Sequence, residues 1–374
     1  MRRLLSALAV VFITPLTATA ETFPSSAGPL VVETILRGLE HPWGLAFLPE
    51  GRFLVTERPG RLRIASVEGG LSPPLGNVPR VVADDQSGLL DVVLDLNFRN
   101  NKTIYLCFNP DETGAVHLAS ARLILDGSPR LGHLRLLFEQ QGRPAPRGWN
   151  VVCRIRPSAD GTLFLSLGEH GHHTEAQNLA NHLGKIVRIR PDGSAPPDNP
   201  FAGRADARPE IWTYGHRNIS GLAVDPLDGR LWATEHGPRG GDELNIIEKG
   251  KNYGWPVITH GIGYDGKPIG IGTRKDSMEQ PVRHWNRSIA PSGITFYSGK
   301  LWPAWRGSVF IGGLAANVLI RLPRDRTRVI GEDRLLQSLG ERIRGVYEGP
   351  EGALWLLTDN PEGRILRILP KRRG

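Results

Sequence analysis

One pattern of hydrophobic and polar positions recurs along the chain and predicts β-hairpins. An alternating apolar segment is followed by a turn with Pro, Asp or Glu beside Gly, and then by a segment rich in β-branched and aromatic residues. Alternation places apolar residues on one face of a strand, and Gly permits the tight turn between two strands. Clear copies occupy residues 44–56, 151–166, 221–234 and 343–358, and weaker copies occupy residues 89–108 and 293–311.

The recurrence of this hairpin predicts an all-β propeller. About six copies, at spacings of roughly 45 to 80 residues, are typical of stacked four-stranded units, and radial stacking hides most strand edges. A pair of β-sandwiches is the alternative, but it does not explain one pattern that recurs over the whole length. The segments 181–208 and 237–287 are rich in Gly and Pro. We therefore expect them to be functional loops on one face of the propeller, without blade strands.

The composition is that of an ordinary globular protein. The 374 residues are 40% hydrophobic and 22% charged, which excludes a wholly disordered chain. The formal net charge is +8, but acidic residues are interleaved with the basic ones, and the basic cluster at residues 371–373 is only a tail. We therefore expect a generally cationic surface and no nucleic-acid partner.

The first twenty residues predict export. Two arginines precede an apolar run at residues 4–16, and Ala18-Thr19-Ala20 fits a small-residue cleavage site. A retained membrane anchor is the alternative, but the run is shorter than the roughly 20 residues that a span needs. We therefore predict a signal peptide at residues 1–20 and a single propeller domain at residues 21–374. The mature protein would have no membrane span and would be periplasmic or secreted.

Two cysteines, Cys107 and Cys153, lie in apolar runs that read as strands. An exported protein can form a disulfide between them, and two buried free thiols fit the sequence equally well.

Two polar runs flank the hairpin at residues 221–234 and are expected to lie close together, because they sit at the ends of neighbouring strands. The run YGHRN at residues 214–218 precedes the hairpin, and the run EHGPRGGDE at residues 235–243 follows it. The second run offers backbone carbonyls on a Gly-rich bend, with Asp242 and Glu243 at its end. Oxygen ligands on such a loop suit Ca²⁺, whereas acids that cap a Gly turn are the structural alternative.

Three arginines are candidates for anion binding. Arg217 could hold an anion through two parallel hydrogen bonds, or form a surface salt bridge. Arg342 and Arg344 flank Ile343 at strand spacing, so both point to one face. Such a pair is typical of a bound polyanion, and two solvated side chains are the alternative.

Several other chemistries are disfavoured by the motifs. The histidines at residues 170, 172, 173 and 182 lack the spacing of a zinc site. The sequence contains no GxGxxG fingerprint, Walker A loop or GxSxG elbow, which argues against dinucleotide, nucleotide and serine-hydrolase functions.

Eight short runs, in order along almost the whole mature chain, resemble one enzyme family. They are HPWGLAF (41–47), GLLDV (88–92), NHLGKI (181–186), YGHRN (214–218), EHGPRGGDE (235–243), NYGWP (252–256), APSG (290–293) and RIR (342–344). The run at 235–243 is highly specific. With these runs the chain resembles the soluble PQQ-dependent sugar dehydrogenases, in the aldose sugar dehydrogenase branch of the glucose/sorbosone dehydrogenase family.

The resemblance implies a six-bladed propeller that carries PQQ and Ca²⁺ on one face. It also implies that an aldose is oxidised at C1 to the lactone, with electrons passing to an external acceptor. Arg217 would then polarise the quinone carbonyl, and further contacts to PQQ would come from the matching residues Gln86, Asn218, Tyr264, Arg342 and Arg344.

The resemblance also implies two calcium sites. The backbone oxygens of Gly237 and Pro238 would ligate the Ca²⁺ that holds PQQ, and Glu243 and Tyr253 match a second, structural calcium site.

The chain departs from the family where the proton acceptor is expected. The family's base histidine lies in a run like NHFGGRL, and the run WNVVCRI at residues 149–155 puts Asn150 at that position. An amide cannot accept the C1 hydroxyl proton. The acid that orients the histidine corresponds to Glu169. Two hypotheses follow. The first is a PQQ- and calcium-dependent dehydrogenase in which Glu169 is the nearest candidate to replace the base, and the second is a non-catalytic propeller that binds a sugar or a quinone.

Overall fold

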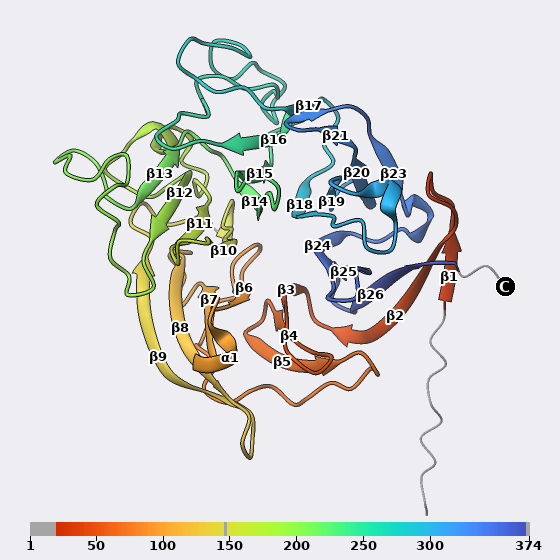
Figure 1. Ribbon diagram of the computed structural model, residues 1–374. Helices are drawn as coiled ribbons and strands as arrows, with labels where there is room; N and C mark the ends of the chain where they lie inside the picture. The colour runs from red at the N-terminus through yellow and green to blue at the C-terminus, as the bar shows by residue number, and fades with distance from the viewer. Residues whose placement is uncertain (1–19, 146–147, 372–374) are drawn as a thin grey trace, which may run out of the picture.

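The strands of the protein form six blades around a central axis (Figure 1). The structure is a computed structural model that describes residues 20–145 and 148–371. The predicted six-bladed β-propeller is confirmed. The predicted signal peptide lies outside the described residues except for Ala20, and it stays a prediction. None of the helices in the described ranges has the length and apolar character needed to cross a membrane.

The first four blades follow one another in the sequence, and successive strands within a blade are antiparallel neighbours. The first blade comprises β3 (Pro42–Phe47), β4 (Arg52–Glu57) and β5 (Arg61–Ser66). The second comprises β6 (Leu89–Leu94), β7 (Thr103–Phe108), β8 (His117–Ile124) and β9 (Arg130–Glu139). The third comprises β10 (Ile155–Pro157), β11 (Leu163–Leu167), β12 (Lys185–Ile189) and β13 (Ile211–Tyr214). The fourth comprises β14 (Ile219–Val224), β15 (Leu231–Glu235), β16 (Asp242–Ile247) and β17 (Arg283–Trp285).

The last blade closes the ring with a strand from the other end of the chain. The fifth blade comprises β18 (Pro291–Phe296), β19 (Val309–Gly313), β20 (Val318–Leu322) and β23 (Asp333–Leu335). The sixth comprises β24 (Ile343–Glu348), β25 (Leu354–Thr358), β26 (Gly363–Pro370), β2 (Leu30–Leu39) and β1 (Ala20–Phe23). Because β2 pairs with β26 from Leu30 opposite Pro370 to Leu39 opposite Gly363, the two ends of the chain share one sheet.

A few short elements lie outside the blades. They are the helix α1 (Phe98–Asn101), the 3-10 turns η2 (His173–Gln177), η3 (Pro303–Trp305) and η4 (Gln337–Leu339), and the strand pair β21 (Arg324–Asp325) and β22 (Arg328–Val329).

Each of the six predicted hairpins is the first hairpin of one blade, so the pattern that predicts them is confirmed. The turns of the four clear copies each carry a glycine in the left-handed region, where a side chain would be strained. These glycines are Gly51, Gly161, Gly229 and Gly352, with φ of 71°, 82°, 74° and 90°.

The prediction that residues 181–208 and 237–287 contain no blade strands is wrong. The third strand of the third blade, β12, lies in the first segment, and β16 and β17 lie in the second. These strands are only three to six residues long, so the Gly and Pro residues around them dominate the composition of the segment. The connection from β16 to β17 nevertheless projects beyond the ring, at the top of Figure 1.

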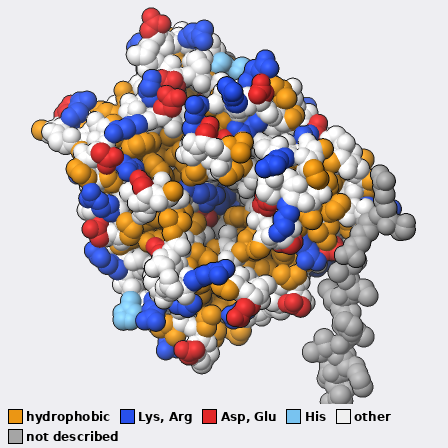
Figure 2. Space-filling view, viewed as in Figure 1, with side chains coloured by type: hydrophobic (Ala, Val, Ile, Leu, Met, Phe, Trp, Pro, Cys, Tyr) orange, Lys and Arg blue, Asp and Glu red, His pale blue; other side chains and the backbone are white. Residues whose placement is uncertain are grey.

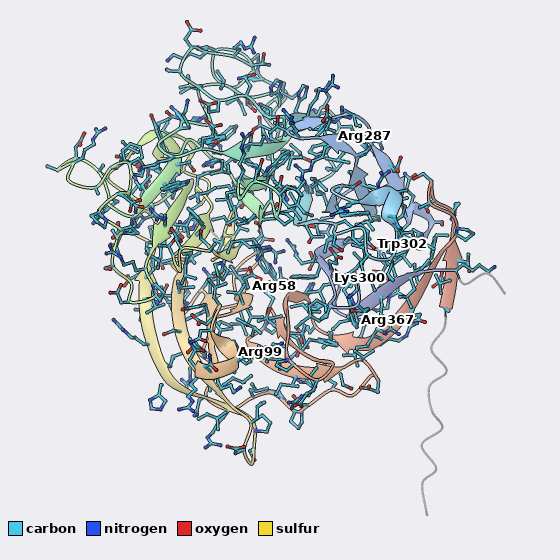
Figure 3. The ribbon with its side chains drawn as sticks, in the orientation of Figure 1. Arg58, Arg99, Arg287, Lys300, Trp302 and Arg367 are labelled. Carbon is cyan, nitrogen blue, oxygen red and sulfur yellow. The ribbon has the colours of Figure 1, made fainter. Side chains whose placement is uncertain are left out.

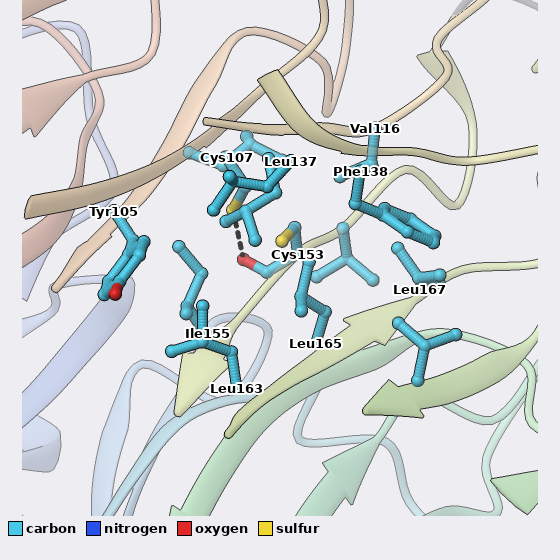
Figure 4. Close-up of a cluster of buried hydrophobic side chains, with 14 of the residues drawn as sticks. Tyr105, Cys107, Val116, Leu137, Phe138, Cys153, Ile155, Leu163, Leu165 and Leu167 are labelled. Atoms are coloured by element: carbon cyan, nitrogen blue, oxygen red, sulfur yellow. Dashed lines mark hydrogen bonds between the residues drawn. The ribbon is translucent and has the colours of Figure 1, made fainter. Parts of the chain in front are cut away.

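The hydrophobic core is divided into six clusters of buried side chains, one between each pair of adjacent blades in the described part of the chain. Figure 4 shows the cluster between the second and third blades, which contains Cys107 and Cys153. Both cysteines are buried free thiols, and Cys107 Sγ lies 3.5 Å from the carbonyl oxygen of Cys153. The structure therefore favours free thiols over a disulfide.

The antiparallel pairing gives the propeller two distinct faces. The beginning of each blade's first strand lies beside the end of its second strand, as in the pairs Pro42 with Glu57 and Ile343 with Thr358. We call this side of the ring the entry face, and the opposite side, where α1 lies, the exit face. A cavity of about 600 Å³ on the axis is lined by the far ends of all six first strands. The hollow in Figure 2 shows hydrophobic side chains around basic ones at the centre of the ring.

Candidate functional site

The predicted site residues come from four blades but meet on the entry face. Gln86 precedes β6, Asn150 precedes β10, and Arg217 and Asn218 precede β14, while Arg344 is the second residue of β24. Glu169 and Gly237 follow the second strands of the third and fourth blades. In Figure 3 Arg58, which follows a second strand, also lies toward the centre of the ring, whereas Arg99 and Arg367 lie farther out.

Asn150 and Glu169 form the deepest polar contact of the site. Asn150 Nδ2 donates a hydrogen bond to Glu169 Oε1 at 2.6 Å, and His173 Nδ1 lies 3.2 Å from the same oxygen. Glu169 is fully buried, and its backbone N–H donates to the carbonyl of Arg217. Gly168 permits this approach, because a Cβ there would lie 1.8 Å from the Asn150 carbonyl oxygen.

The runs at 214–218 and 235–243 lie side by side, as predicted. The backbone N–H of Arg217 donates to the Glu235 carboxylate, and Arg217 Nη1 donates to the carbonyls of Gly237 at 2.8 Å and His236 at 3.2 Å. The guanidinium also lies over the ring of Trp255, with Cζ 5.5 Å from the ring centroid. These contacts fix the Arg217 side chain, which is buried.

Asn218, at the start of the fourth blade, connects this blade to the second blade, because its Nδ2 donates to Gln86 Oε1 at 3.2 Å. His236 lies between the fourth and fifth blades and donates from Nε2 to the carbonyl of Pro291 at 2.6 Å. Burial lowers the pKa of His236, so its ring is neutral at neutral pH. The positive charge on this part of the entry face therefore comes from arginines.

Arg342 and Arg344 share one carboxylate, Asp359. Arg344 Nη2 lies 2.7 Å and Arg342 Nη2 lies 3.4 Å from Asp359 Oδ2. The two arginines differ in exposure, since 46% of the Arg342 side chain and 11% of the Arg344 side chain are accessible. Burial acts to raise the pKa of Asp359, but the charge of Arg344 and hydrogen bonds from His41 and Arg344 outweigh it and hold that pKa below its ordinary value.

Among the buried polar atoms that have no hydrogen-bond partner in the described residues, four belong to predicted site residues on the entry face. Buried polar groups in folded proteins are nearly always paired, so such atoms mark a place where a polar ligand fits. They are Arg217 Nε, Asn218 Oδ1, Arg344 Nε and Glu169 Oε2.

Asp242 holds the Gly-rich bend of residues 235–243 in shape. Its Oδ1 accepts from the Gly237 N–H at 2.9 Å, and its Oδ2 accepts from the N–H groups of Ile289 and Ala290 at 2.8 Å and from the Ser288 hydroxyl at 2.7 Å. For this acid the structural alternative is the better description, because both oxygens are occupied by donors.

Glu243 and Tyr253 line one small cavity together with Arg217, Glu235 and Gly237. Burial and the neighbouring charge of Glu235 raise the pKa of Glu243 to about 8. Glu243 forms no ion pair with the described residues, and its Oε2 accepts a hydrogen bond from Asn245 Nδ2 at 3.1 Å. The Tyr253 hydroxyl is occupied, since it donates to the Ile246 carbonyl at 2.6 Å and accepts from the Glu248 N–H at 2.9 Å. Only the Tyr253 carbonyl is left as a metal ligand.

Tyr264 lies at the outer edge of the site. Its side chain is largely solvent-accessible (63%), and its ring centroid lies 6.4 Å from that of Trp149, beside Asn150. Within residues 20–145 and 148–371 no group of three or more His, Cys, Asp or Glu side chains converges as a metal cluster.

Sequence reasoning missed the acids that support the arginines. A Thr followed by an acid stands at the end of the second strand in three blades, at Thr56-Glu57, Thr234-Glu235 and Thr358-Asp359, where Asp359 is the first residue after β25. Glu235 anchors the Arg217 backbone, and Asp359 holds Arg342 and Arg344. The repeated dipeptide at equivalent positions of the hairpin pattern is the signal that identifies them.

Comparisons with known proteins give a consistent result. The family model described as glucose/sorbosone dehydrogenase matches residues 39–367. The aldose sugar dehydrogenase YliI of Escherichia coli (strain K12) is 39% identical over 365 residues, which cover 96% of this chain and 98% of that protein.

Two solved structures share the fold over most of the chain. The crystal structure of a glucose dehydrogenase has a TM-score of 0.88 and 46% identity, and the match covers 91% of this chain and 99% of that one. The PQQ-bound form of aldose sugar dehydrogenase from Streptomyces coelicolor has a TM-score of 0.74 and 29% identity, with 91% and 98% covered.

Proposed function

The chain belongs to the glucose/sorbosone dehydrogenase family, and from this premise we propose that it oxidises an aldose at C1 to the lactone with PQQ as cofactor. Family members are PQQ-dependent sugar dehydrogenases, which agrees with the resemblance seen in the sequence. We further propose that calcium assists PQQ and that electrons pass to an external acceptor.

The observation that carries this proposal is the set of unpaired buried polar atoms on the entry face. Arg217 Nε and Arg344 Nε are donors without acceptors among the described residues, and Asn218 Oδ1 lies in the same region. PQQ is a polycarboxylate with quinone oxygens, so it offers the acceptors that two buried guanidiniums need. The residues present therefore fit the cofactor.

The arginines of this chain would bind and orient the cofactor. Arg344 is fixed by Asp359 and by the ring of Trp43, which lies 5.7 Å from its Cζ, so it loses little freedom on binding a carboxylate. Arg342 is half-exposed and would contribute less. Arg217, held between Gly237 and Trp255, would donate to a quinone oxygen. When bound, PQQ supplies the quinone that accepts hydride from the sugar.

Asn150 and Glu169 would hold the sugar hydroxyl whose proton must leave. Asn150 offers a hydrogen bond but cannot accept a proton, whereas Glu169 Oε2 is buried and unpaired within the described residues. Glu169 would therefore be the proton acceptor. A carboxylate is a weaker base than an imidazole, so we expect slow turnover.

Calcium binding is proposed at the carbonyls of Gly237 and Pro238, and at Glu243 with the Tyr253 carbonyl. In the structure Arg217 donates to the Gly237 carbonyl, so a cation there requires this guanidinium to turn away. A second proposal concerns location: the N-terminal segment supports export, which would place the enzyme in the periplasm or outside the cell.

Calorimetric titration of the purified protein with PQQ tests cofactor binding. Titrations with added Ca²⁺ and with EDTA should differ, with tight binding only when calcium is present. Equally tight binding in EDTA would remove calcium from the proposal, and no binding in either buffer would remove PQQ.

Asn150 supports one alternative, a propeller that binds a sugar or a quinone without turnover. Measured PQQ binding combined with no aldose-dependent dye reduction, by the wild type and by Asn150→His alike, would favour this alternative over the dehydrogenase.

A further inference from the structure

Arg154 occupies the axis of the propeller directly beneath the candidate site. Its side chain is fully buried, although it belongs to a residue type that rarely leaves solvent. The guanidinium lies over the ring of Trp43, with Cζ 3.9 Å from the ring centroid. None of the predicted roles uses this residue.

The guanidinium of Arg154 is bonded to four other blades. Nε donates to the carbonyl of Ser220 at 3.0 Å, and Nη2 donates to the carbonyl of Arg344 at 3.1 Å. Nη1 lies 3.4 Å from the carbonyl of Trp43 and 3.4 Å from Asp91 Oδ1. Arg154 itself precedes the third blade, so one side chain connects blades one, two, three, four and six.

These acceptors belong to the walls of the site. Ser220 is two residues after Asn218, and the Arg344 carbonyl belongs to the residue that would bind a cofactor carboxylate. The segment 150–154, which runs from Asn150 to Arg154 itself, is the third segment that borders the site. The planar guanidinium presents five N–H donors in a fixed fork, so it holds several backbone segments in defined directions, whereas the ammonium of a lysine has only three donors, which rotate about a flexible stem.

We propose that Arg154 is a positioning residue, which sets the spacing between Asn150, Asn218 and Arg344 and thereby determines how tightly the site binds its cofactor. The expected effect on cofactor affinity rests on the proposed function. The hydrogen bonds of Arg154 that support the inference do not depend on the cofactor. A bond network of this kind could instead serve stability alone, so the test must separate the two.

Arg324 provides a matched control. It is equally buried, pairs with the buried Asp225 through Nη1 at 2.5 Å and Nη2 at 2.9 Å, and lies over the ring of Phe296 with Cζ 4.7 Å from the centroid. It lies between the fourth and fifth blades, away from the residues of the candidate site. Both substitutions therefore remove a buried guanidinium and its set of N–H donors. Arg154→Lys does so beside the candidate site, and Arg324→Lys does so away from it.

The two variants are compared by PQQ titration in the presence of Ca²⁺ and by backbone hydrogen exchange without cofactor. We expect Arg154→Lys to weaken PQQ binding at least tenfold and Arg324→Lys to change it less than twofold, at a similar loss of melting temperature. Without cofactor, Arg154→Lys should speed exchange in the segments 148–155, 216–221 and 342–346 together, and Arg324→Lys should leave all three unchanged.

Equal PQQ affinity in Arg154→Lys and wild type would overturn the proposal, as would unchanged exchange in the three segments. Failure of the wild type to bind PQQ would count against the proposed function only, because the exchange experiment still decides the role of Arg154. If Arg154→Lys does not fold, Asp91→Asn weakens the same network by removing one charged acceptor. It should give the same pattern with a smaller change, and no change would overturn the proposal.

Discussion

The proposed proton transfer would depend on Asn150 and on the carboxylate that it contacts, Glu169. Glu169 Oε1 lies 2.6 Å from Asn150 Nδ2, where it could also orient a ring nitrogen at residue 150. The φ of Asn150 is 51°, in a region that histidine tolerates better than most residues. A histidine at this position would therefore find both a permitted backbone and an orienting acid.

Asn150→His is expected to raise the rate of aldose oxidation at least tenfold. A positioned imidazole contributes about 10²–10⁴-fold to such a proton transfer, and tenfold allows for imperfect geometry. Steady-state rates with PQQ, Ca²⁺ and a dye acceptor measure the effect, with Asn150→Ala as the control that adds no base. If Asn150→His leaves the rate of aldose oxidation unchanged or lowers it, and the wild type already turns over rapidly, then another base is sufficient.

Glu169→Gln is expected to lower wild-type turnover by about 10²-fold or more, because the only buried carboxylate beside Asn150 in the described residues is lost. PQQ affinity should change little. Glu175→Gln is the matched control, since Glu175 follows in the same connection but bonds only Asn178 and Asn181 through its side chain. Equal turnover in Glu169→Gln and wild type would exclude Glu169 as the proton acceptor.

For single residues, the sequence predicts Arg342 and Arg344 better than it predicts the acid that pairs with them. Arg342 and Arg344 flank one residue of a strand, so their common direction follows from the period of two. Asp359 is 15 residues beyond Arg344 and reaches it only because β24 and β25 are paired, which a local pattern cannot reveal. The close contact of Gly168 with Asn150 is likewise a product of the fold.

Among the elements, the first hairpin of each blade was predictable because a regular alternation and a turn glycine coincide in a window of about fifteen residues. The third strands of the blades cannot be predicted in this way. β12 has five buried residues, KIVRI, without any polar alternation, because both of its faces pack against neighbouring blades. Such a run between Gly and Pro residues looks like part of a loop when composition is averaged.

The contact between β24 and the end of β25 depends on pH through Asp359. The folded-state pKa of Asp359 is held below its ordinary value, so its stabilising effect is complete at neutral pH and is lost as the pH falls. Asp359→Asn leaves the buried Arg344 unpaired and should cost about 3 kcal/mol at pH 7. Denaturant unfolding of both proteins between pH 7 and pH 2.5 measures the difference, which should begin to shrink below about pH 4. A constant difference over this range would contradict the assigned pairing.

The ring as a whole depends on one junction between the ends of the chain. β2 completes the sixth blade by pairing with β26, and its residues Leu30 and Val32 belong to the cluster between the fifth and sixth blades. The repeated hairpin pattern predicts the propeller, but no copy of the pattern includes β2. The closure follows from the need to cover the edge of β26 rather than from local sequence.

Deletion of residues 1–39 should therefore abolish cooperative thermal unfolding, because β26 would be left as an open edge. Deletion of residues 1–29 removes β1 and its buried Phe23 but keeps β2, so it should lower the melting temperature and leave the transition cooperative. Near-ultraviolet circular dichroism during heating compares the two proteins. A sharp transition in the longer deletion would show that closure by β2 is dispensable.

Aldose-dependent dye reduction by the reconstituted wild type tests the proposal that this propeller is a PQQ-dependent aldose dehydrogenase. The purified protein is loaded with PQQ and Ca²⁺, freed of excess cofactor, and mixed with a panel of aldoses and an artificial acceptor. We expect slow but measurable dye reduction that requires PQQ, forms the lactone, and is lost in Arg217→Ala. Protein that retains PQQ but reduces no dye with any aldose would contradict this proposal.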